Sequence, residues 1–394
     1  MTIKIGIVAG EASGDLLGAG LMAALKEYLG GPETSPTQVR FIGVGGPAML
    51  AAGLEPLAAL EDLSVNGFKD PILRLPALLK LFRSLRDTCL EEAVDVFVGV
   101  DFNVFNLLLE KSLKKRGVKT VHYVSPSVYA WRTGRTRKIA RSADLLLCLF
   151  PFEPDFYTNT AVKAVFVGHP LADQVDPPTT ADADKMKQLR TRLNLPLDAP
   201  LLGLLPGSRR SEVGFMIDVF LQAARLFRQR LPNARVVIPC VTPAIHAQVV
   251  SAVEGAGLGD FVVAVQEPAR EVLAAADVAL IKSGTSTLEG MLLRCPMVVS
   301  YRLGSVTFAV VKRLVHSPHV ALPNILSGRG VVPEYLQDDA TPENLCEGLL
   351  SVYAAPDEQL NEFSRLHSEL RRDANATAAR AVIALMGNSA KGAG

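Results

Sequence analysis

The chain has 394 residues, of which 49% are hydrophobic, and its 41 Lys and Arg residues against 40 Asp and Glu residues give a formal net charge of +1. A chain of this length and composition can bury a large core, and two domains are expected rather than one. The balanced charge excludes a global electrostatic footprint for nucleic acid, so an anionic partner would have to be met locally.

No signal for export or for a membrane span is evident. The chain enters an apolar strand without a basic and apolar leader, and no run of about eighteen uncharged apolar residues occurs, so we expect a cytoplasmic protein. The five cysteines are widely spaced and form no Cys-x-x-Cys pair. We therefore interpret them as small buried hydrophobic residues rather than as metal ligands or disulfides.

The first predicted unit is a strand followed by a glycine-rich loop and a helix. A buried strand over residues 3–9 ends at the loop 10–15, and a helix over 16–28 follows. The loop has G-x-x-x-G spacing, which matches neither the G-x-G-x-x-G dinucleotide fingerprint nor a G-K-[ST] phosphate loop. Tight packing of the helix against the strand would explain these glycines without any ligand.

The composition of the chain changes over residues 63–86, and the pattern there predicts an amphipathic helix. Apolar side chains recur at near-helical spacing with basic side chains between them, a pattern that suits the surface of an anionic membrane. An ordinary surface helix packed on the core gives the same periodicity, so both interpretations stay open. The apolar set is Ile72, Leu75, Leu78, Leu79, Phe82 and Leu85, and the basic set is Arg74, Lys80, Arg83 and Arg86.

A buried strand over residues 94–100 leads directly into Asp101. An acid at the carboxyl end of a parallel strand faces the crevice in which open α/β sheets bind ligands. Asp101 is therefore a candidate general base, with the N-cap of the following helix as the alternative. After a further strand over 119–124, a basic segment over 132–141 would either hold a phosphate or be solvated.

The second half repeats the alternation of strands and helices after a connecting segment, residues 176–200, that is rich in Pro, Asp and Thr. A strand over 201–205 stops at a Pro-Gly pair and opens into a helix, whose unpaired N–H groups and dipole favour an anion. Ser208 is expected to cap this helix, and Arg209 offers a guanidinium suited to phosphate oxygens. A turn with solvated arginines is the alternative.

A second loop of the same kind follows a strand over 278–282. Residues 283–287 form a small, hydroxyl-rich turn that opens a helix, which predicts another phosphate-type loop in the same half. Glu289 would lie about one turn inside that helix, within reach of a sugar hydroxyl pair, or else be an ordinary exposed acid. The whole pattern predicts two doubly wound α/β halves, with two helices and a frayed tail after residue 341.

Five motifs occur in order along the chain. They are Gly-Glu-Ala-Ser-Gly-Asp at 10–15, Tyr-Val-Ser-Pro-Ser-Val-Tyr-Ala-Trp-Arg at 123–132, Leu-Pro-Gly-Ser-Arg at 205–209, Ser-Gly-Thr-Ser-Thr-Leu-Glu at 283–289 and Leu-Pro-Asn-Ile-Leu at 322–326. Together they resemble the lipid-A-disaccharide synthase family over nearly the whole chain. The resemblance implies a GT-B fold of two Rossmann-like domains with a cleft between them. Residues 1–175 would bind the acceptor and contact the membrane, 176–345 would bind the UDP-sugar, and 346–394 would form C-terminal helices and a frayed tail.

The resemblance implies an inverting glycosyltransferase. It would join UDP-2,3-diacylglucosamine to 2,3-diacylglucosamine 1-phosphate, releasing UDP and forming the β-1,6-linked precursor of lipid A in Gram-negative bacteria. It would act at the inner face of the inner membrane as a peripheral protein, with no nucleic acid partner and with a homodimer left open. No metal or cofactor is expected, because helix termini and Arg209 can stabilise the UDP leaving group.

Two other functions stay open at this point. Another GT-B enzyme, such as a UDP-sugar epimerase or a soluble transferase, would share the phosphate-type loops. A non-catalytic UDP-sugar-binding protein of the membrane surface would keep the loops without turnover.

The resemblance also assigns site residues. Asp101 would be the general base, with His122 and Glu11 as alternatives, and Arg209 would act on the leaving group. The family pattern has a second Asp and a Pro in the loop after Asp101, whereas this chain has Asn103 and Val104, which argues against a two-carboxylate arrangement. The substrate-binding set is Glu11, Ser13, Arg132 toward the acceptor phosphate, Ser208, Ser283, Gly284, Thr285, Thr287, Glu289 toward the ribose, and Asn324.

Overall fold

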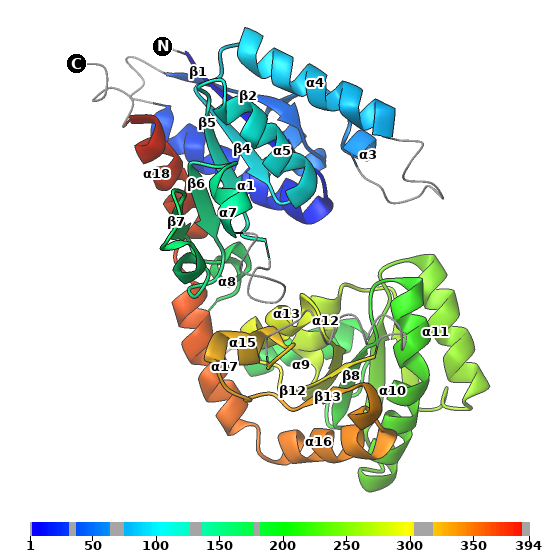
Figure 1. The fold of residues 1–394 in the computed structure, drawn as a ribbon. Coiled ribbons are helices and arrows are strands. Elements are labelled where there is room, and N and C mark those ends of the chain that lie inside the picture. The colour runs from blue at the N-terminus through cyan, green and yellow to red at the C-terminus, as the bar shows by residue number, and fades with distance from the viewer. Residues whose placement is uncertain are drawn as a thin grey trace. The chain divides into compact units, whose positions relative to one another are not determined.

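The computed structural model describes residues 2–30, 37–63, 75–126, 136–176, 182–302 and 318–387. The chain divides into two compact units, Met1–Asp173 with Leu370–Gly394 and Gln174–Glu369 (Figure 1). Each unit is built on one parallel sheet, as the alternating pattern predicted. The C-terminal segment 346–394, which the sequence set apart, is shared between the two units.

The first unit contains a seven-stranded sheet. Its strands are β1 (Thr2–Ala9), β2 (Gln38–Val44), β3 (Leu54–Pro56), β4 (Val96–Val100), β5 (Lys119–Tyr123), β6 (Leu145–Cys148) and β7 (Lys163–Phe166). They lie in the order β3-β2-β1-β4-β5-β6-β7, with parallel pairing throughout. The direction of winding reverses between β1 and β4, so the loops after these two strands flank the switch point at which such sheets bind ligands.

Helices bury both faces of this sheet (Figure 1). Ile7 and Val8 are adjacent in β1 and belong to cores on opposite faces, because side chains alternate along a strand. One face is covered by α1 (Ala12–Leu29) and α18 (Ala374–Gly387), and the other by α4 (Leu75–Glu91) and α5 (Asn103–Lys114). The shorter helices are α2 (Pro47–Ala51), α3 (Leu60–Leu63), α7 (Thr136–Ala140), η2 (Pro154–Tyr157) and α8 (Pro170–Gln174).

The second unit contains a six-stranded parallel sheet. Its strands are β8 (Leu201–Leu205), β9 (Arg235–Pro239), β10 (Val262–Val265), β11 (Val278–Lys282), β12 (Met297–Tyr301) and β13 (Glu334–Leu336), in the order β10-β9-β8-β11-β12-β13. The switch point here lies between β8 and β11, the strands that end at the two phosphate-type loops. The helices are α9 (Asp182–Arg192), α10 (Arg210–Arg230), α11 (Pro243–Gly255), α12 (Ala269–Ala275), α13 (Ser286–Leu292), α15 (Leu322–Ser327), η3 (Gln337–Asp339), α16 (Pro342–Ala354) and α17 (Asp357–Leu370).

The C-terminal region forms three helices, α16, α17 and α18, so the expectation of two was wrong. The extra boundary lies at Asp373, which has a left-handed backbone with φ 51°. The Asp173 carboxylate accepts the N–H groups of Asp373 at 3.0 Å and Ala374 at 2.6 Å and so satisfies the start of α18. Gly20 of α1 leaves room for Asn375 of α18, whose side chain lies 2.6 Å from where a Cβ would stand.

The five cysteines are all buried and unpaired, as the sequence predicted. No helix in the described part of the chain combines the length and the apolar character needed to span a membrane.

A buried acid in the first unit makes stability depend on pH. Glu153 is 2% exposed and accepts the N–H of Phe150 at 2.9 Å. Burial raises its pKa from 4.5 to about 8. Because the folded pKa lies above the unfolded one, the folded state keeps a proton that the unfolded chain releases, and stability is lost as pH rises through this window.

The substitution Glu153→Gln removes this titration. We expect its effect on the free energy of unfolding, relative to the native protein, to be more stabilising at pH 8 than at pH 5 by about 2–4 kcal/mol. Urea denaturation at both pH values measures this difference. An equal effect at the two pH values would contradict the assignment.

Candidate active site

Five of the residues selected in the second half converge on one pocket. Because β8 and β11 are paired, the loops that follow them lie side by side at the carboxyl edge of the sheet. Ser208 and Arg209 from the first loop and Ser283, Gly284 and Thr285 from the second line a pocket of about 260 Å³. The other lining residues are Leu205, Gly207, Glu212, Pro239, Val241, Ala269, Lys282 and Ser286.

The first loop is closed at the start of α10, a helix of 21 residues, by the side chain of Glu212. Arg209 is the N-cap, so the expectation that Ser208 caps the helix was wrong. Glu212 Oε2 accepts the N–H groups of Ser208 at 3.1 Å and Arg209 at 3.4 Å. Gly207 has φ 137° and faces Glu212, whose Cβ lies 2.6 Å from where a Cβ on Gly207 would stand. Glycine is therefore required for this turn.

Two cations meet the same carboxylate. Glu212 Oε1 lies 3.3 Å from Arg209 Nη1 and 3.2 Å from Lys282 Nζ, and the three side chains together carry one net positive charge. Burial alone would raise the pKa of Glu212, but Lys282, the Ser208 N–H and Arg209 together lower it. Lys282 Nζ also lies 4.8 Å from the centre of the Tyr301 ring.

Lys282 was not selected from the sequence. The signal that would have identified it is its position, since it is the last residue of β11 and so stands at the ligand-binding edge of the sheet. Its side chain is 14% exposed, against 79% for Arg209. The pocket therefore has one cation fixed in its wall and another that reaches into solvent.

The second loop turns some of its hydroxyl groups inward. Thr287 is fully buried, donates to Gly284 O at 2.8 Å and accepts the N–H of Leu322 at 3.4 Å. Ser283 Oγ donates to Val320 O at 2.9 Å. Gly284 and Thr285 are exposed. The hydroxyls of Ser283 and Thr287 thus hold the loop against residues 320–322, and the exposed Gly284 and Thr285 line the pocket.

Asn324 is 1% exposed, and its side chain is engaged within the protein. Its amide nitrogen donates to Val332 O and Glu334 Oε1, each at 2.8 Å, and its oxygen accepts the N–H groups of Val331 and Val332. Glu289 lies in α13, half-buried, and does not line the pocket. Burial raises the pKa of Glu289, against the opposing effect of Arg270.

The selected residues of the first unit lie at its own switch point. Glu11 lies in the loop after β1 and Ser13 in the first turn of α1, both exposed, and Asp101 follows β4, which pairs with β1. The ring of Phe102 packs against Gly10, where a Cβ would overlap it, and so joins the two loops. The three polar side chains therefore belong to one edge of the sheet.

Asp101 is not the N-cap of α5, since Phe102 occupies that position. The Asp101 carboxylate is partly exposed and accepts a hydrogen bond from Asn103 Nδ2 at 3.1 Å. His122, the alternative base, is fully buried and lies 2.6 Å from Glu110 Oε1 and 3.1 Å from Asn103 Oδ1. Of the candidate bases, Asp101 and Glu11 thus reach solvent and His122 does not.

The Asp of the first motif has a structural role. Asp15 is 4% exposed, and its carboxylate accepts the N–H groups of Gly46, Ala48 and Met49 at 2.8–3.0 Å. It therefore fastens the first turn of α1 to the start of α2. Arg132 lies outside the described residues.

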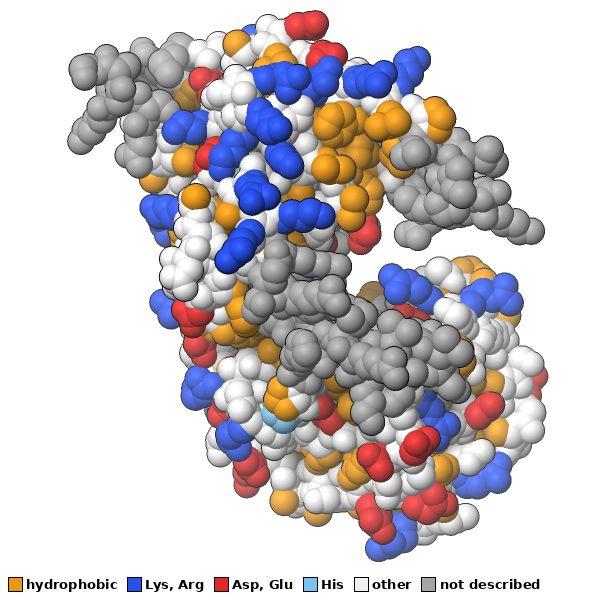
Figure 2. Space-filling view, in the orientation of Figure 1, with side chains coloured by type: hydrophobic (Ala, Val, Ile, Leu, Met, Phe, Trp, Pro, Cys, Tyr) orange, Lys and Arg blue, Asp and Glu red, His pale blue; other side chains and the backbone are white. Residues whose placement is uncertain are grey.

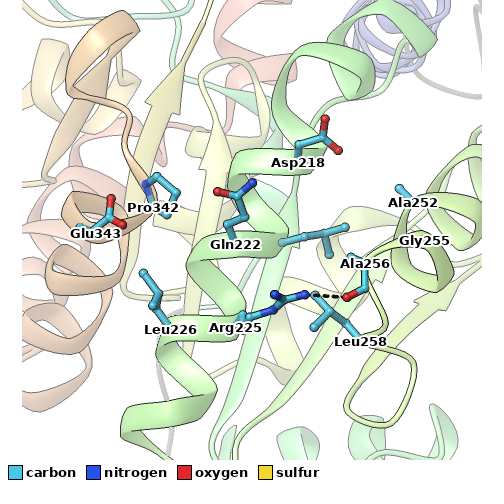
Figure 3. Close-up of a pocket in the computed structure, with 11 residues that line it drawn as sticks. Asp218, Gln222, Arg225, Leu226, Ala252, Gly255, Ala256, Leu258, Pro342 and Glu343 are labelled. Carbon is cyan, nitrogen blue, oxygen red and sulfur yellow. Dashed lines mark hydrogen bonds between the residues drawn. The ribbon is translucent and has the colours of Figure 1, made fainter.

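A second, larger hollow of about 630 Å³ lies between α10, α11 and α16 (Figure 3). It is lined mainly by residues of these helices, together with Ala256 and Leu258 from the loop after α11. Arg225 crosses it to donate to Ala256 O at 2.6 Å. None of the residues selected from the sequence lines it.

Across both units, the described residues include no group of three or more His, Cys, Asp or Glu side chains placed to hold a metal ion.

Comparison with solved structures supports the architecture. A glycosyltransferase from Rickettsia africae is similar over 100% of this chain and 99% of its own, with a TM-score of 0.59 and 9% identity. A UDP-GlcNAc 2-epimerase from Neisseria meningitidis, bound to UDP-GlcNAc, is similar over 98% of this chain and all of its own, with a TM-score of 0.58 and 12% identity. At these identities the likeness concerns the fold alone.

Comparison of sequences is more specific. A family model described as lipid-A-disaccharide synthetase matches residues 5–382. The lipid-A-disaccharide synthase of Pseudomonas fluorescens is 47% identical over 98% of both chains, and that of Dechloromonas aromatica is 43% identical over 97% of this chain and 98% of its own. With a match that spans both sheets and both groups of loops, the chain belongs to the lipid-A-disaccharide synthase family of GT-B glycosyltransferases.

Proposed function

We propose that this enzyme transfers the diacylglucosamine unit of UDP-2,3-diacylglucosamine to 2,3-diacylglucosamine 1-phosphate and forms the β-1,6-linked disaccharide 1-phosphate. The observation that carries the proposal is the pocket at the switch point of the second unit, where two loops, the start of a long helix and two cations meet. It suits a nucleoside diphosphate. The family match supports the choice of sugar and acceptor.

In this proposal the pocket residues hold the UDP diphosphate. Arg209 and Lys282 supply charge, and the backbone at the start of α10 with Ser208, Gly284 and Thr285 supplies hydrogen-bond donors. Ser283, whose hydroxyl donates to Val320 O, forms part of the pocket wall. Thr287 and Asn324 shape the site from within by holding the second loop and residues 331–334. Glu289 is assigned to the ribose hydroxyls. In the first unit, Glu11 and Ser13 bind the acceptor beside Asp101, and Arg132 is assigned to its 1-phosphate.

The chemistry is one in-line displacement. The acceptor 6-hydroxyl attacks C1 of the donor sugar and gives its proton to Asp101, while the bond from C1 to the phosphate oxygen breaks and its electron pair leaves with UDP. An α-linked donor thus becomes a β-glycoside in a single inversion. Arg209, Lys282 and the helix N–H groups stabilise the charge that develops on the leaving phosphate, so the step needs no metal ion.

The test is UDP release from purified enzyme given the donor with and without the acceptor, in detergent and EDTA, with products weighed by mass spectrometry. Acceptor-dependent UDP and a disaccharide phosphate are expected. UDP release that does not depend on the acceptor would indicate a hydrolase or an epimerase-like activity instead. Binding of the donor without release of UDP would indicate a non-catalytic protein.

Both proposed substrates are acylated, and we propose that α4 contacts the anionic inner face of the inner membrane. The helix packs on the core through Leu85, which is 1% exposed, and through the partly buried Leu78 and Phe82. Leu79 is 47% exposed, and Leu108 on the adjacent α5 is 56% exposed. Figure 2 shows apolar and basic side chains on adjoining parts of the surface over these helices. In this proposal both interpretations of the segment apply, each to a different side of one helix.

We expect Leu79→Ser combined with Leu108→Ser to weaken sedimentation with vesicles containing phosphatidylglycerol by roughly tenfold, because two partly exposed leucines lose their insertion energy. Leu78 and Phe82 are left intact because they also pack on the core. Leu197→Ser, at a leucine of the second unit that is 46% exposed, is the matched control. Unchanged sedimentation of the folded double variant would exclude α4 as the contact.

A further inference from the structure

A line of hydrogen bonds runs from the proposed base into the buried interior of the first unit. Asn103 Nδ2 lies 3.1 Å from Asp101 Oδ1, and Asn103 Oδ1 lies 3.1 Å from His122 Nε2. His122 Nδ1 lies 2.6 Å from Glu110 Oε1. His122 and Glu110 are fully buried, whereas Asn103 and Asp101 are partly exposed. One asparagine therefore connects a buried pair to a carboxylate at the surface of the site.

The donors and acceptors along this line have a defined direction. An ionised Asp101 only accepts hydrogen bonds, so the Asn103 amide presents its N–H group to Asp101 and its oxygen to His122. His122 Nε2 must then carry a proton, and the short contact between Nδ1 and Glu110 holds a second one. Burial raises the pKa of Glu110, and the pair carries no net charge wherever the shared proton lies. The proton on His122 Nε2 thus fixes the orientation of the Asn103 amide, with its N–H group toward Asp101.

The backbone at Asp101 is held in a costly conformation. Asp101 and Phe102 are consecutive non-glycine residues with left-handed φ angles of 47° and 46°. Asn106 stabilises this turn from the buried side, since its Nδ2 lies 3.1 Å from Val8 O, 3.2 Å from Val100 O and 2.9 Å from Asp101 O. The strained turn lies at the same edge of the sheet as the loop after β1.

The supporting residues share one face of α5. Asn103, Asn106 and Glu110 are spaced three and four residues apart and so line the side of the helix toward β4 and β5. Gly99 in β4 makes room for the acid, because a Cβ at that position would overlap Glu110 Oε1. Burying a polar pair such as His122–Glu110 stabilises a fold less than apolar packing would. We therefore expect this pair, which is connected to Asp101 through Asn103, to have a role other than stability.

We propose that Asn103 is a positioning residue that orients the Asp101 carboxylate toward the acceptor hydroxyl, and that the buried His122–Glu110 pair fixes the orientation of Asn103. This inference rests on the proposed role of Asp101 as the general base.

A double-mutant cycle tests the proposal. Asn103→Ala is made in the native enzyme and in Asp101→Asn, and kcat and KM for both substrates are measured by UDP release. In the native background we expect kcat to fall about tenfold with KM unchanged within about twofold, because a lost orienting hydrogen bond acts on the transition state. In the Asp101→Asn background Asn103→Ala should change kcat less than about twofold, since no base is left to orient. Lys115→Ala, at an exposed position near the end of α5, is the matched control for a surface change in this helix.

The outcomes separate this inference from the proposed function. If Asp101→Asn is impaired but Asn103→Ala is silent, or has the same effect in both backgrounds, the positioning role is overturned and the base assignment stands. If Asp101→Asn turns over normally, the base assignment falls and the positioning role falls with it.

A second variant examines the buried pair. His122→Leu combined with Glu110→Leu replaces both buried polar partners by apolar ones of similar size and so avoids an unpaired buried group. We expect a fall in kcat comparable to that of Asn103→Ala and no further loss when Asn103→Ala is added. Additive losses in the folded triple variant would show that the pair does not act through Asn103.

Discussion

Asp101→Asn is expected to lower turnover by roughly two or more orders of magnitude, which is the range that general-base catalysis supplies. Asparagine is nearly the same size, and its amide oxygen can still accept the hydrogen bond from Asn103 Nδ2 that the carboxylate accepts at 3.1 Å. The strained turn at residues 101–102, with Asn106 bonded to its backbone, does not depend on a charged side chain. The substitution therefore removes the proton acceptor and little else.

The measurement is kcat at saturating donor and acceptor, with UDP affinity determined separately by calorimetry. UDP affinity should be unchanged, because the pocket assigned to UDP belongs to the other unit. Turnover within a few-fold of the native enzyme would transfer the role of base elsewhere. Glu11→Gln would then be the next variant, since Glu11 is the other exposed carboxylate after a neighbouring strand.

Much of the fold could be predicted from periodicity. Strands β8 and β11 begin and end at the predicted residues, because each is a short apolar run bounded by turn signals. The edge strands β3 and β13 were not predicted, since each has three residues and neither carries an alternating pattern. The return of α18 to the first unit was also missed. It depends on packing between α1 and α18, at positions such as Gly20, that no local pattern shows.

The site was predictable where a residue type and a strand end coincide, as at Asp101. It was less predictable where some side chains of a motif line the pocket and others hold the loops from inside the protein. Asn324 and Thr287 belong to recognisable motifs, but the structure turns their polar atoms inward. Lys282 and Glu212 lie 70 residues apart, and their ion pair exists only because β8 and β11 are neighbours. Sequence motifs thus located the loops, and only the folded chain shows which atoms each loop presents.

Arg209→Ala is expected to weaken UDP binding by roughly 10- to 100-fold and to lower turnover as well, because a guanidinium facing a diphosphate makes charge-assisted hydrogen bonds that alanine cannot replace. Its side chain is 79% exposed, so it is free to reach a ligand. In the structure Arg209 is paired with Glu212, so a bound phosphate would compete with this carboxylate for the guanidinium. Lys282→Ala should have an effect of similar direction, and it should also leave the partly buried Glu212 with one cation fewer.

The adjacent Arg210 is the matched control, since it is exposed, begins the same helix and does not line the pocket. Arg210→Ala keeps the net charge change of Arg209→Ala, so a general electrostatic effect would appear in both variants and a specific contact in Arg209→Ala alone. Calorimetric titration with UDP should show a Kd within about twofold of native for Arg210→Ala, because charges not in contact with the ligand are screened by solvent and salt. If both variants lose UDP affinity equally, long-range attraction rather than a specific contact explains the role of Arg209. If Arg209→Ala retains its UDP affinity, Lys282 and the start of α10 remain as the phosphate-binding groups.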